Sequence, residues 1–349
     1  MLVAFRGKEM RVALKIVAGL VGAVVLLAGA GLGFLALKTP AQRPASAEKL
    51  EATPARLARG EYLVEHVSAC VHCHSDHDEG IYGMPLVPGT KGRGGYAFGP
   101  NDGVPGFVQA QNITPDLETG KGNWTDGELL RAIREGISKD GHALFPMMPY
   151  ENFRAMSDED AKSVVVYLRT LAPVRHPIKP RELAFPVNFL VKNVPQPLTG
   201  PVAAPDDAKD HHAYGEYLVT IAGCAICHTP MGERGQRIEE RRLGGGWEMK
   251  YSTGRVVTAN ITPAEGTWLS EATRDEFIGR FRAWNQTPPT ACPKTRNTLM
   301  PWDNYAGMTD QDLTAIYDYL KTVKPVPGVI NPWPDAEPAL SVATSGIGR

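Results

Sequence analysis

A long internal repeat constrains this 349-residue chain more than any other feature of its sequence. The string GEYLVEHVSACVHCH returns in the second half as GEYLVTIAGCAICH. NITPD at Asn112 returns as NITPA at Asn260, and MPYENFRAMSDED from Met148 returns as MPWDNYAGMTDQD from Met300. Because the matched blocks keep their order, the repeat predicts two copies of one structural unit.

Each copy contains a Cys-x-x-Cys-His motif. Residues three and four apart share one face of a helix, so both thiols can bond the vinyl groups of one haem while the His offers a ring nitrogen to iron. The motif therefore predicts two covalently attached c-type haems. The attachment residues are Cys70, Cys73 and His74 in the first copy and Cys224, Cys227 and His228 in the second.

Two other uses of these cysteines are a zinc site and disulfides in an exported chain. Neither requires a His directly after both second cysteines, so the sequence favours haem. The fifth cysteine, Cys292, can be a buried thiol, an intermolecular link or an iron ligand. Its Pro-rich surroundings favour the buried thiol.

The sixth iron ligand comes from one of two matched methionine pairs. Met148 and Met300 each precede Pro, which disfavours helix and suits an extended loop across the haem face. Met156 and Met308 directly precede helix caps and fit hydrophobic staples. We therefore predict Met148 and Met300 as ligands. His/Met ligation raises the reduction potential and leaves iron no open position.

Capping signals predict three main helices in each copy. The signals are Thr53-Pro54, the boxes Thr125-x-x-Glu128 and Thr273-x-x-Glu276, and the caps Ser157 and Thr309. Strand signals are few. The predicted fold is mainly α, with two tandem domains after one N-terminal transmembrane helix.

Composition shifts predict the domain boundaries. The predicted segments are a cytoplasmic stub and anchor (1–38), a spacer (39–53), domain 1 (54–175), a Pro-rich linker (176–207), domain 2 (208–326) and an irregular tail (327–349). The linker holds too many prolines for a long helix or a central strand. Its apolar string AFPVNFLV is expected to pack on a domain surface.

The N-terminal segment is predicted to cross a membrane. Residues 16–37 carry no charge and follow a basic stretch, so they can span a bilayer with the N-terminus in the cytoplasm. A cleaved signal peptide ending at Ala45-Ser46-Ala47 is the alternative. The apolar run is longer than a signal core, which favours an uncleaved anchor. Both interpretations export the rest of the chain.

Each copy resembles a class I bacterial cytochrome c domain. Over residues 55–326, the CxxCH, NITP and Met-Pro blocks are similar to the cytochrome c subunits of periplasmic alcohol, gluconate and aldehyde dehydrogenase complexes. Those subunits have three haem domains, whereas this chain has two. The resemblance also implies second-shell residues near haem, for which loop capping or core packing is the alternative role. These residues are Asn112, Trp124, Asn260 and Trp268.

The resemblance implies an electron-transfer protein with no substrate chemistry of its own. A periplasmic dehydrogenase would be the donor, and a quinone site, a soluble cytochrome or a terminal oxidase the acceptor. The protein would sit in the bacterial inner membrane with its haem domains in the periplasm. The formal net charge of −1 gives no sign of a nucleic-acid partner.

Two alternatives to electron transfer remain open from the sequence. A dihaem enzyme, such as a peroxidase or a sulfur-compound dehydrogenase, would need one iron without a Met ligand. Cys292 is its only support in the sequence. A structural subunit would need the anchor but not two redox centres.

Overall fold

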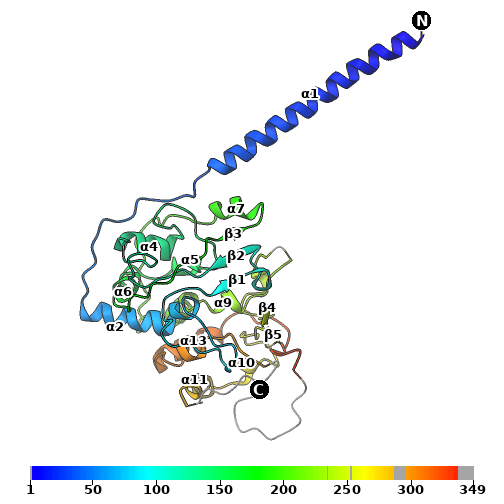
Figure 1. Cartoon of the computed structure of the whole chain (residues 1–349). Helices are drawn as coiled ribbons and strands as arrows, with labels where there is room; N and C mark the ends of the chain where they lie inside the picture. Colours follow the sequence, from blue (N-terminus) through cyan, green and yellow to red (C-terminus); the bar gives the residue numbers. More distant parts are fainter. Residues whose placement is uncertain (1, 234, 252–253, 287–295, 337–349) are drawn as a thin grey trace.

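The computed structural model describes residues 2–233, 235–251, 254–286 and 296–336. Cys292 and the end of the predicted tail lie outside these ranges. The described chain is mainly helical, as predicted, and consists of one long N-terminal helix and a body of short helices and loops (Figure 1).

The N-terminal helix, α1 (Leu2–Leu37), projects away from the body (Figure 1). Its apolar part, Leu14–Leu37, is 24 residues long and none of it is buried. A bilayer core needs about 20 residues of helix. The helix is therefore long and apolar enough for a membrane anchor, and a signal sequence has the same character.

The first half of the body is built around two helices that pack together, α2 and α6. Thr53 caps α2, and Thr125 with Glu128 forms the predicted capping box of α4. Ser157 caps α6 as predicted. The helices of this half are α2 (Pro54–Tyr62), the π-helical turn η1 (Leu63–Val67), α3 (Cys70–Cys73), η2 (Pro100–Asp102), α4 (Asp126–Glu135), α5 (Tyr150–Phe153) and α6 (Asp158–Leu168).

The second half repeats this order, with α8 packed against α13. Thr273 with Glu276 forms the predicted capping box, and Thr309 caps the last helix. The helices are α8 (His211–Ile221), α9 (Cys224–Cys227), η4 (Glu239–Arg241), α10 (Trp268–Glu271), α11 (Arg274–Arg282), η5 (Ala283–Gln286), α12 (Trp302–Tyr305) and α13 (Asp310–Leu320).

Two small antiparallel sheets complete the body. One joins β1 (Ala97–Phe98), β2 (Gly106–Gln109) and β3 (Glu182–Leu183), and the other joins β4 (Glu248–Tyr251) and β5 (Gly254–Val257). Phe107 pairs with Glu182. The Pro-rich linker therefore supplies an edge strand, followed by α7 (Val187–Leu190) and η3 (Val191–Asn193).

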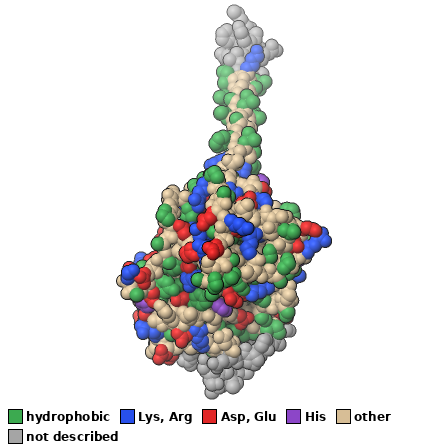
Figure 2. Space-filling model, turned by 90° about the vertical axis from the view of Figure 1, so that its left-hand side faces the viewer, with side chains coloured by type: hydrophobic (Ala, Val, Ile, Leu, Met, Phe, Trp, Pro, Cys, Tyr) green, Lys and Arg blue, Asp and Glu red, His purple; other side chains and the backbone are tan. Residues whose placement is uncertain are grey.

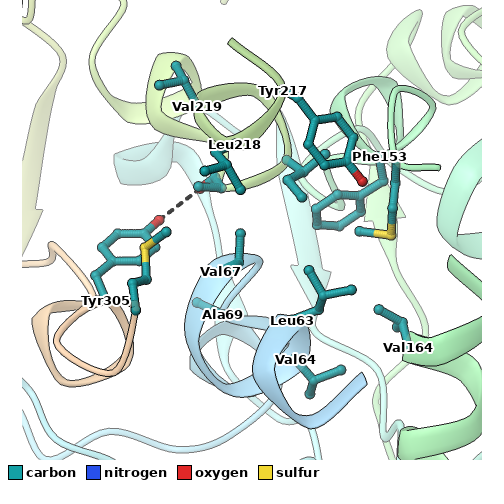
Figure 3. Close-up of a cluster of buried hydrophobic side chains, with 14 of the residues drawn as sticks. Leu63, Val64, Val67, Ala69, Phe153, Val164, Tyr217, Leu218, Val219 and Tyr305 are labelled. Atoms are coloured by element: carbon teal, nitrogen blue, oxygen red, sulfur yellow. Dashed lines mark hydrogen bonds between the residues drawn. The ribbon is translucent and has the colours of Figure 1, made fainter. Parts of the chain in front are cut away.

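The buried apolar side chains of both halves form one continuous core (Figure 3). Leu63 and Val67 of the first half and Leu218 of the second are fully buried in it. Tyr305 reaches the same cluster from α12. Since apolar burial is the main favourable term in folding, this shared core holds the halves together.

Two tyrosines carry hydrogen bonds between the halves, and we call Tyr62 and Tyr217 the bridging tyrosines. The Tyr62 hydroxyl donates to Asp312 Oδ2 at 2.6 Å and accepts from the Thr309 amide at 3.0 Å. Thr309 is the N-cap of α13 and Asp312 its third residue. In a capping box the Asp312 carboxylate would accept directly from the Thr309 amide. Here the Tyr62 hydroxyl, from the other half, lies between the amide and the carboxylate and bonds to both.

The second bridging tyrosine, Tyr217, forms the equivalent hydrogen bonds from the second half to the first. Tyr217 donates to Asp160 Oδ2 at 2.5 Å and accepts from the Ser157 amide at 3.1 Å. Asp160 is buried and also pairs with Arg59, from Nε to Oδ1 at 2.8 Å. Each half therefore completes the N-terminal cap of the other half's last helix.

We predict that Tyr62→Phe weakens the cap of α13 in the opposite half. The variant removes a hydrogen bond to a charged group and an acceptor for the Thr309 amide, which should lower the free energy of unfolding by about 1.5–3 kcal/mol. Hydrogen exchange at the Thr309 amide should become faster.

Tyr167→Phe is the matched control, since its hydroxyl donates to Glu65 Oε1 at 2.9 Å within the first half. That variant should leave exchange at Thr309 unchanged. Equal protection of Thr309 in Tyr62→Phe and the unmodified protein would contradict the bridging role.

Candidate haem sites

Each Cys-x-x-Cys motif occupies one separate helical turn. Ala69, at φ 44°, and Gly223, at φ 71°, precede these turns in the left-handed conformation. The motif cysteines of α3 and α9 form no disulfide. Both pairs therefore present free thiols at the three-residue spacing that a c-type haem requires.

The His after each motif is held by a backbone carbonyl. His74 Nδ1 lies 2.6 Å from the Gln111 oxygen, and His228 Nδ1 lies 2.7 Å from the Ala259 oxygen. A carbonyl can only accept, so Nδ1 carries the proton and donates it. Nε2 is then left with the lone pair that binds a metal.

Burial supports the same protonation state. It lowers the pKa of His74 to about 4 and also lowers the pKa of His228. Both rings are therefore neutral near pH 7, as a metal-ligating imidazole must be.

The first NITP block fixes the carbonyl that holds His74. Asn112 follows Gln111 and is fully buried. Its Nδ2 donates to the Val174 carbonyl at 2.8 Å, and its Oδ1 accepts from the Thr114 amide at 3.0 Å. These bonds tie the loop to the chain that leaves α6, and so position the Gln111 oxygen.

The second NITP block makes the same contacts. Asn260 follows Ala259, donates to the Val326 carbonyl at 2.7 Å and accepts from the Thr262 amide at 2.9 Å. The residue that accepts from the His is Gln111 in one copy and Ala259 in the other. The His is therefore held by the backbone oxygen at that position, whichever side chain the residue carries.

Glycines allow the carbonyl-bearing loop to approach the His. The Gly94 amide donates to the His74 carbonyl at 2.9 Å, and Gly245 does the same to His228 at 2.8 Å. Both glycines have positive φ, 73° and 67°. A Cβ on Gly94 would come within 2.5 Å of the Ala110 oxygen, so no larger residue fits there.

Met148 and Met300 precede the same tight turn in both halves. Pro149 has φ −81° and ψ 48°, and Pro301 has φ −73° and ψ 64°, values close to an inverse γ-turn. The amide two residues after each Met donates to its carbonyl, at 2.8 and 2.7 Å. Both Met side chains are partly buried against the core.

The other methionine pair has a packing role. Met156 is 1% exposed and Met308 is 2% exposed, and both belong to the central apolar cluster. This placement fits the hydrophobic contacts predicted for them. Met148 and Met300 remain the candidates for iron.

The cysteine side chains fit a cofactor-lined site. Burial raises the pKa of Cys73 to about 12, and the residue keeps solvent-accessible surface. The donor set of two thiols, a neutral His and a Met therefore fits haem c. Within the described residues, no three His, Cys, Asp or Glu side chains converge on a metal position.

Cysteines of the two attachment turns act on one another electrostatically. Burial and then the charge of Cys227 raise the pKa of Cys73. Burial and then charges on Cys224, Cys227 and Cys73 raise the pKa of Tyr305 well above its usual value. Figure 3 shows Tyr305, whose hydroxyl donates to the Ala222 carbonyl at 2.8 Å. Cysteines of both halves thus lie within electrostatic range of one buried tyrosine.

The loop before Met300 is supported by the first half. Asn297 Oδ1 accepts from the Gly83 amide at 3.1 Å, and Asn297 Nδ2 donates to the Glu79 carbonyl at 3.1 Å. The sequence does not predict this contact, because no local pattern pairs residues more than 200 positions apart.

Aromatic rings continue the same contact. Trp302 stacks on Trp284 with ring centroids 5.6 Å apart, and Trp284 stacks on Tyr82 at 5.4 Å. Tyr82 belongs to the first half and the tryptophans to the second. A cavity of about 120 Å³ beside them is lined by His72 and His77, among others, so these histidines face the interface.

The two tryptophans predicted near haem pack against the core. Trp124 and Trp268 are partly buried there. The Lys121 ammonium lies 4.5 Å from the Trp124 ring centroid, and the Arg280 guanidinium 4.4 Å from that of Trp268. A position of either tryptophan beside haem stays a prediction.

We predict that Asn112→Ala destabilises the first site. It leaves buried backbone groups unpaired, at about 1–3 kcal/mol for each group. Gln111→Ala is the matched control, because it removes an exposed side chain and keeps the carbonyl that His74 uses. Chemical denaturation should show a clear loss of unfolding free energy for Asn112→Ala and none for Gln111→Ala. Equal denaturation midpoints for the two variants would contradict the role of the NITP block.

Comparison with known proteins gives a family for part of the first half of the body. Residues 57–172 match the Cytochrome c family, so this segment is a cytochrome c domain. These residues include the first Cys-x-x-Cys-His motif and Met148.

Relatives of the chain extend this similarity over most of its length. It is 28% identical over 326 residues to the cytochrome c subunit of a quinone alcohol dehydrogenase from Gluconacetobacter polyoxogenes, covering 87% of this chain and 62% of that protein. It is 29% identical to the gluconate 2-dehydrogenase cytochrome c subunit of Pantoea cypripedii, over 78% of this chain and 60% of that subunit. It is also 29% identical to a dihaem c-type cytochrome of Cereibacter sphaeroides, over 86% of this chain and 96% of the relative.

The comparisons confirm the predicted resemblance to cytochrome c subunits of dehydrogenases. The chain spans about three fifths of the length of the alcohol and gluconate dehydrogenase subunits that it matches, and nearly all of the dihaem cytochrome. These similarities support haem c as cofactor and indicate electron transfer.

Proposed function

We propose that this chain carries electrons through two c-type haems, one in each half. On this proposal, the second half is a second cytochrome c domain. The observation that carries it is the matched geometry of the halves: each has a free Cys-x-x-Cys turn, a carbonyl-held His and a Met-Pro turn.

Two groups of residues would hold the haems. Each cysteine pair would attach the porphyrin through thioethers, and the carbonyl-held His and the following Met would supply ligands to the iron. When bound, each haem supplies an iron that changes between the ferrous and ferric states. The residues are Cys70, Cys73, His74 and Met148 for the first haem, and Cys224, Cys227, His228 and Met300 for the second.

Electrons would enter from a periplasmic dehydrogenase, because two of the relatives named above are subunits of dehydrogenases. They would cross from one haem to the other and leave to a quinone site, a soluble cytochrome or a terminal oxidase. The charge of Cys227 in the second half acts on Cys73 in the first half, which supports direct transfer between the haems. The shared core and the bridging tyrosines would keep their separation constant.

The N-terminal helix would hold this relay at the bacterial inner membrane. Its 24-residue apolar span supports a single crossing. The basic residues before the span favour a cytoplasmic N-terminus, which places the haem domains in the periplasm.

We predict that the reduced holoprotein does not bind carbon monoxide readily, because His and Met would occupy both axial positions of each iron. Met148→Ala and Met300→Ala should each open one haem to carbon monoxide, seen as a change in half of the haem absorbance. Met147→Ala, one position from Met148, should leave both sites closed. Rapid binding by the unmodified protein at either haem would contradict His/Met ligation there and favour a dihaem enzyme.

A further inference from the structure

An apolar segment of the linker is exposed instead of packed. The sequence predicts that the string AFPVNFLV, residues 184–191, packs on a domain surface. In the structure only its last residue does so fully, since Val191 is 3% exposed. Phe185 is 70% exposed and Leu190 is 54% exposed. Exposed apolar side chains clustered in one segment mark an interaction surface.

This segment lies beside the end of α1. The Lys192 ammonium donates to the Leu35 carbonyl at 3.2 Å and to the Ala36 carbonyl at 2.8 Å. Lys38 bonds the Asn193 side chain. Helix-terminal carbonyls lack partners within the helix, and a cation there also complements the helix dipole. Figure 1 shows α7 on the side of the body that faces α1.

The position of Lys192 relates the segment to the membrane surface. The apolar span ends at Leu37, and Lys192 contacts the carbonyls one and two residues before that end. Val191 alone separates residues 184–190 from Lys192, so this segment lies near the level at which α1 leaves the bilayer.

The chemistry of the segment suits a membrane interface. Phe185 and Phe189 form an edge-to-face pair with centroids 6.1 Å apart. The Lys192 ammonium lies 5.6 Å from the Phe189 ring centroid. Figure 2 shows Lys and Arg side chains on the body near the foot of α1. Apolar side chains next to cations are typical of segments that rest in the headgroup region.

We propose that residues 184–190 insert into the outer interface of the phospholipid bilayer as a second membrane contact beside α1. This inference rests on the proposed anchor. Attachment at two points would restrain rotation of the body about the end of α1. It would thereby hold the first half near the membrane and the end of the body that carries α10 and α11 away from it (Figure 1).

Photo-crosslinking of the full-length holoprotein tests the proposal. A photoreactive phenylalanine analogue replaces Phe185, Leu190 or the control Val329, and the protein is placed in vesicles of phosphatidylethanolamine and phosphatidylglycerol. Val329 is also 70% exposed, but it lies against Gly266, just before α10. Mass spectrometry of the irradiated peptides should find lipid adducts at 185 and 190, at least tenfold above those at 329.

Two outcomes would overturn the inference, and they are distinguishable. Adducts at 185 and 190 no more abundant than at 329, in a chain whose intact mass includes residues 1–37, would overturn the second contact and leave the anchor standing. An intact mass without residues 1–37 would overturn the anchor and the second contact together. Both outcomes are independent of the haem content, on which the electron-transfer proposal depends.

Discussion

The rest of the body depends on the hydrogen bonds that the bridging tyrosines, Tyr62 and Tyr217, form between the halves. A tyrosine hydroxyl from the first helix of each half joins the cap amide and the third-residue carboxylate of the other half's last helix. The core continues across the same boundary. The first helix leads into the Cys-x-x-Cys turn, and the last helix follows the Met-Pro turn. The two candidate haem sites are thereby held in one rigid arrangement.

Local chemistry predicted the helix starts well. The helix caps are Thr53, Thr125, Ser157, Thr273 and Thr309, and in each case the cap hydroxyl accepts from the backbone amide three residues further along the chain. The bridging contacts could not be predicted in this way. Tyr62 and Asp312 are 250 positions apart. The repeat retains both residue types in each copy, but nothing in the sequence indicates that they pair across copies.

The candidate sites were predictable in their side chains and not in their backbone partners. The cysteines, histidines and methionines belong to repeated motifs, whereas the oxygens that hold His74 and His228 come from unlike residues, Gln111 and Ala259. The prediction for the apolar linker string was wrong at Phe185 and Leu190. Composition indicates that a segment is apolar, but not which apolar surface it meets.

The central claim is that one chain carries two haems, and the intact mass of the purified holoprotein tests it most directly. The thioether bonds survive denaturation, so each haem adds its full mass to the polypeptide. We expect the mass of the chain plus two haems. When Cys224 and Cys227 are both replaced by Ala, we expect the mass of the chain plus one haem. An unmodified chain that carries one haem or none would contradict it.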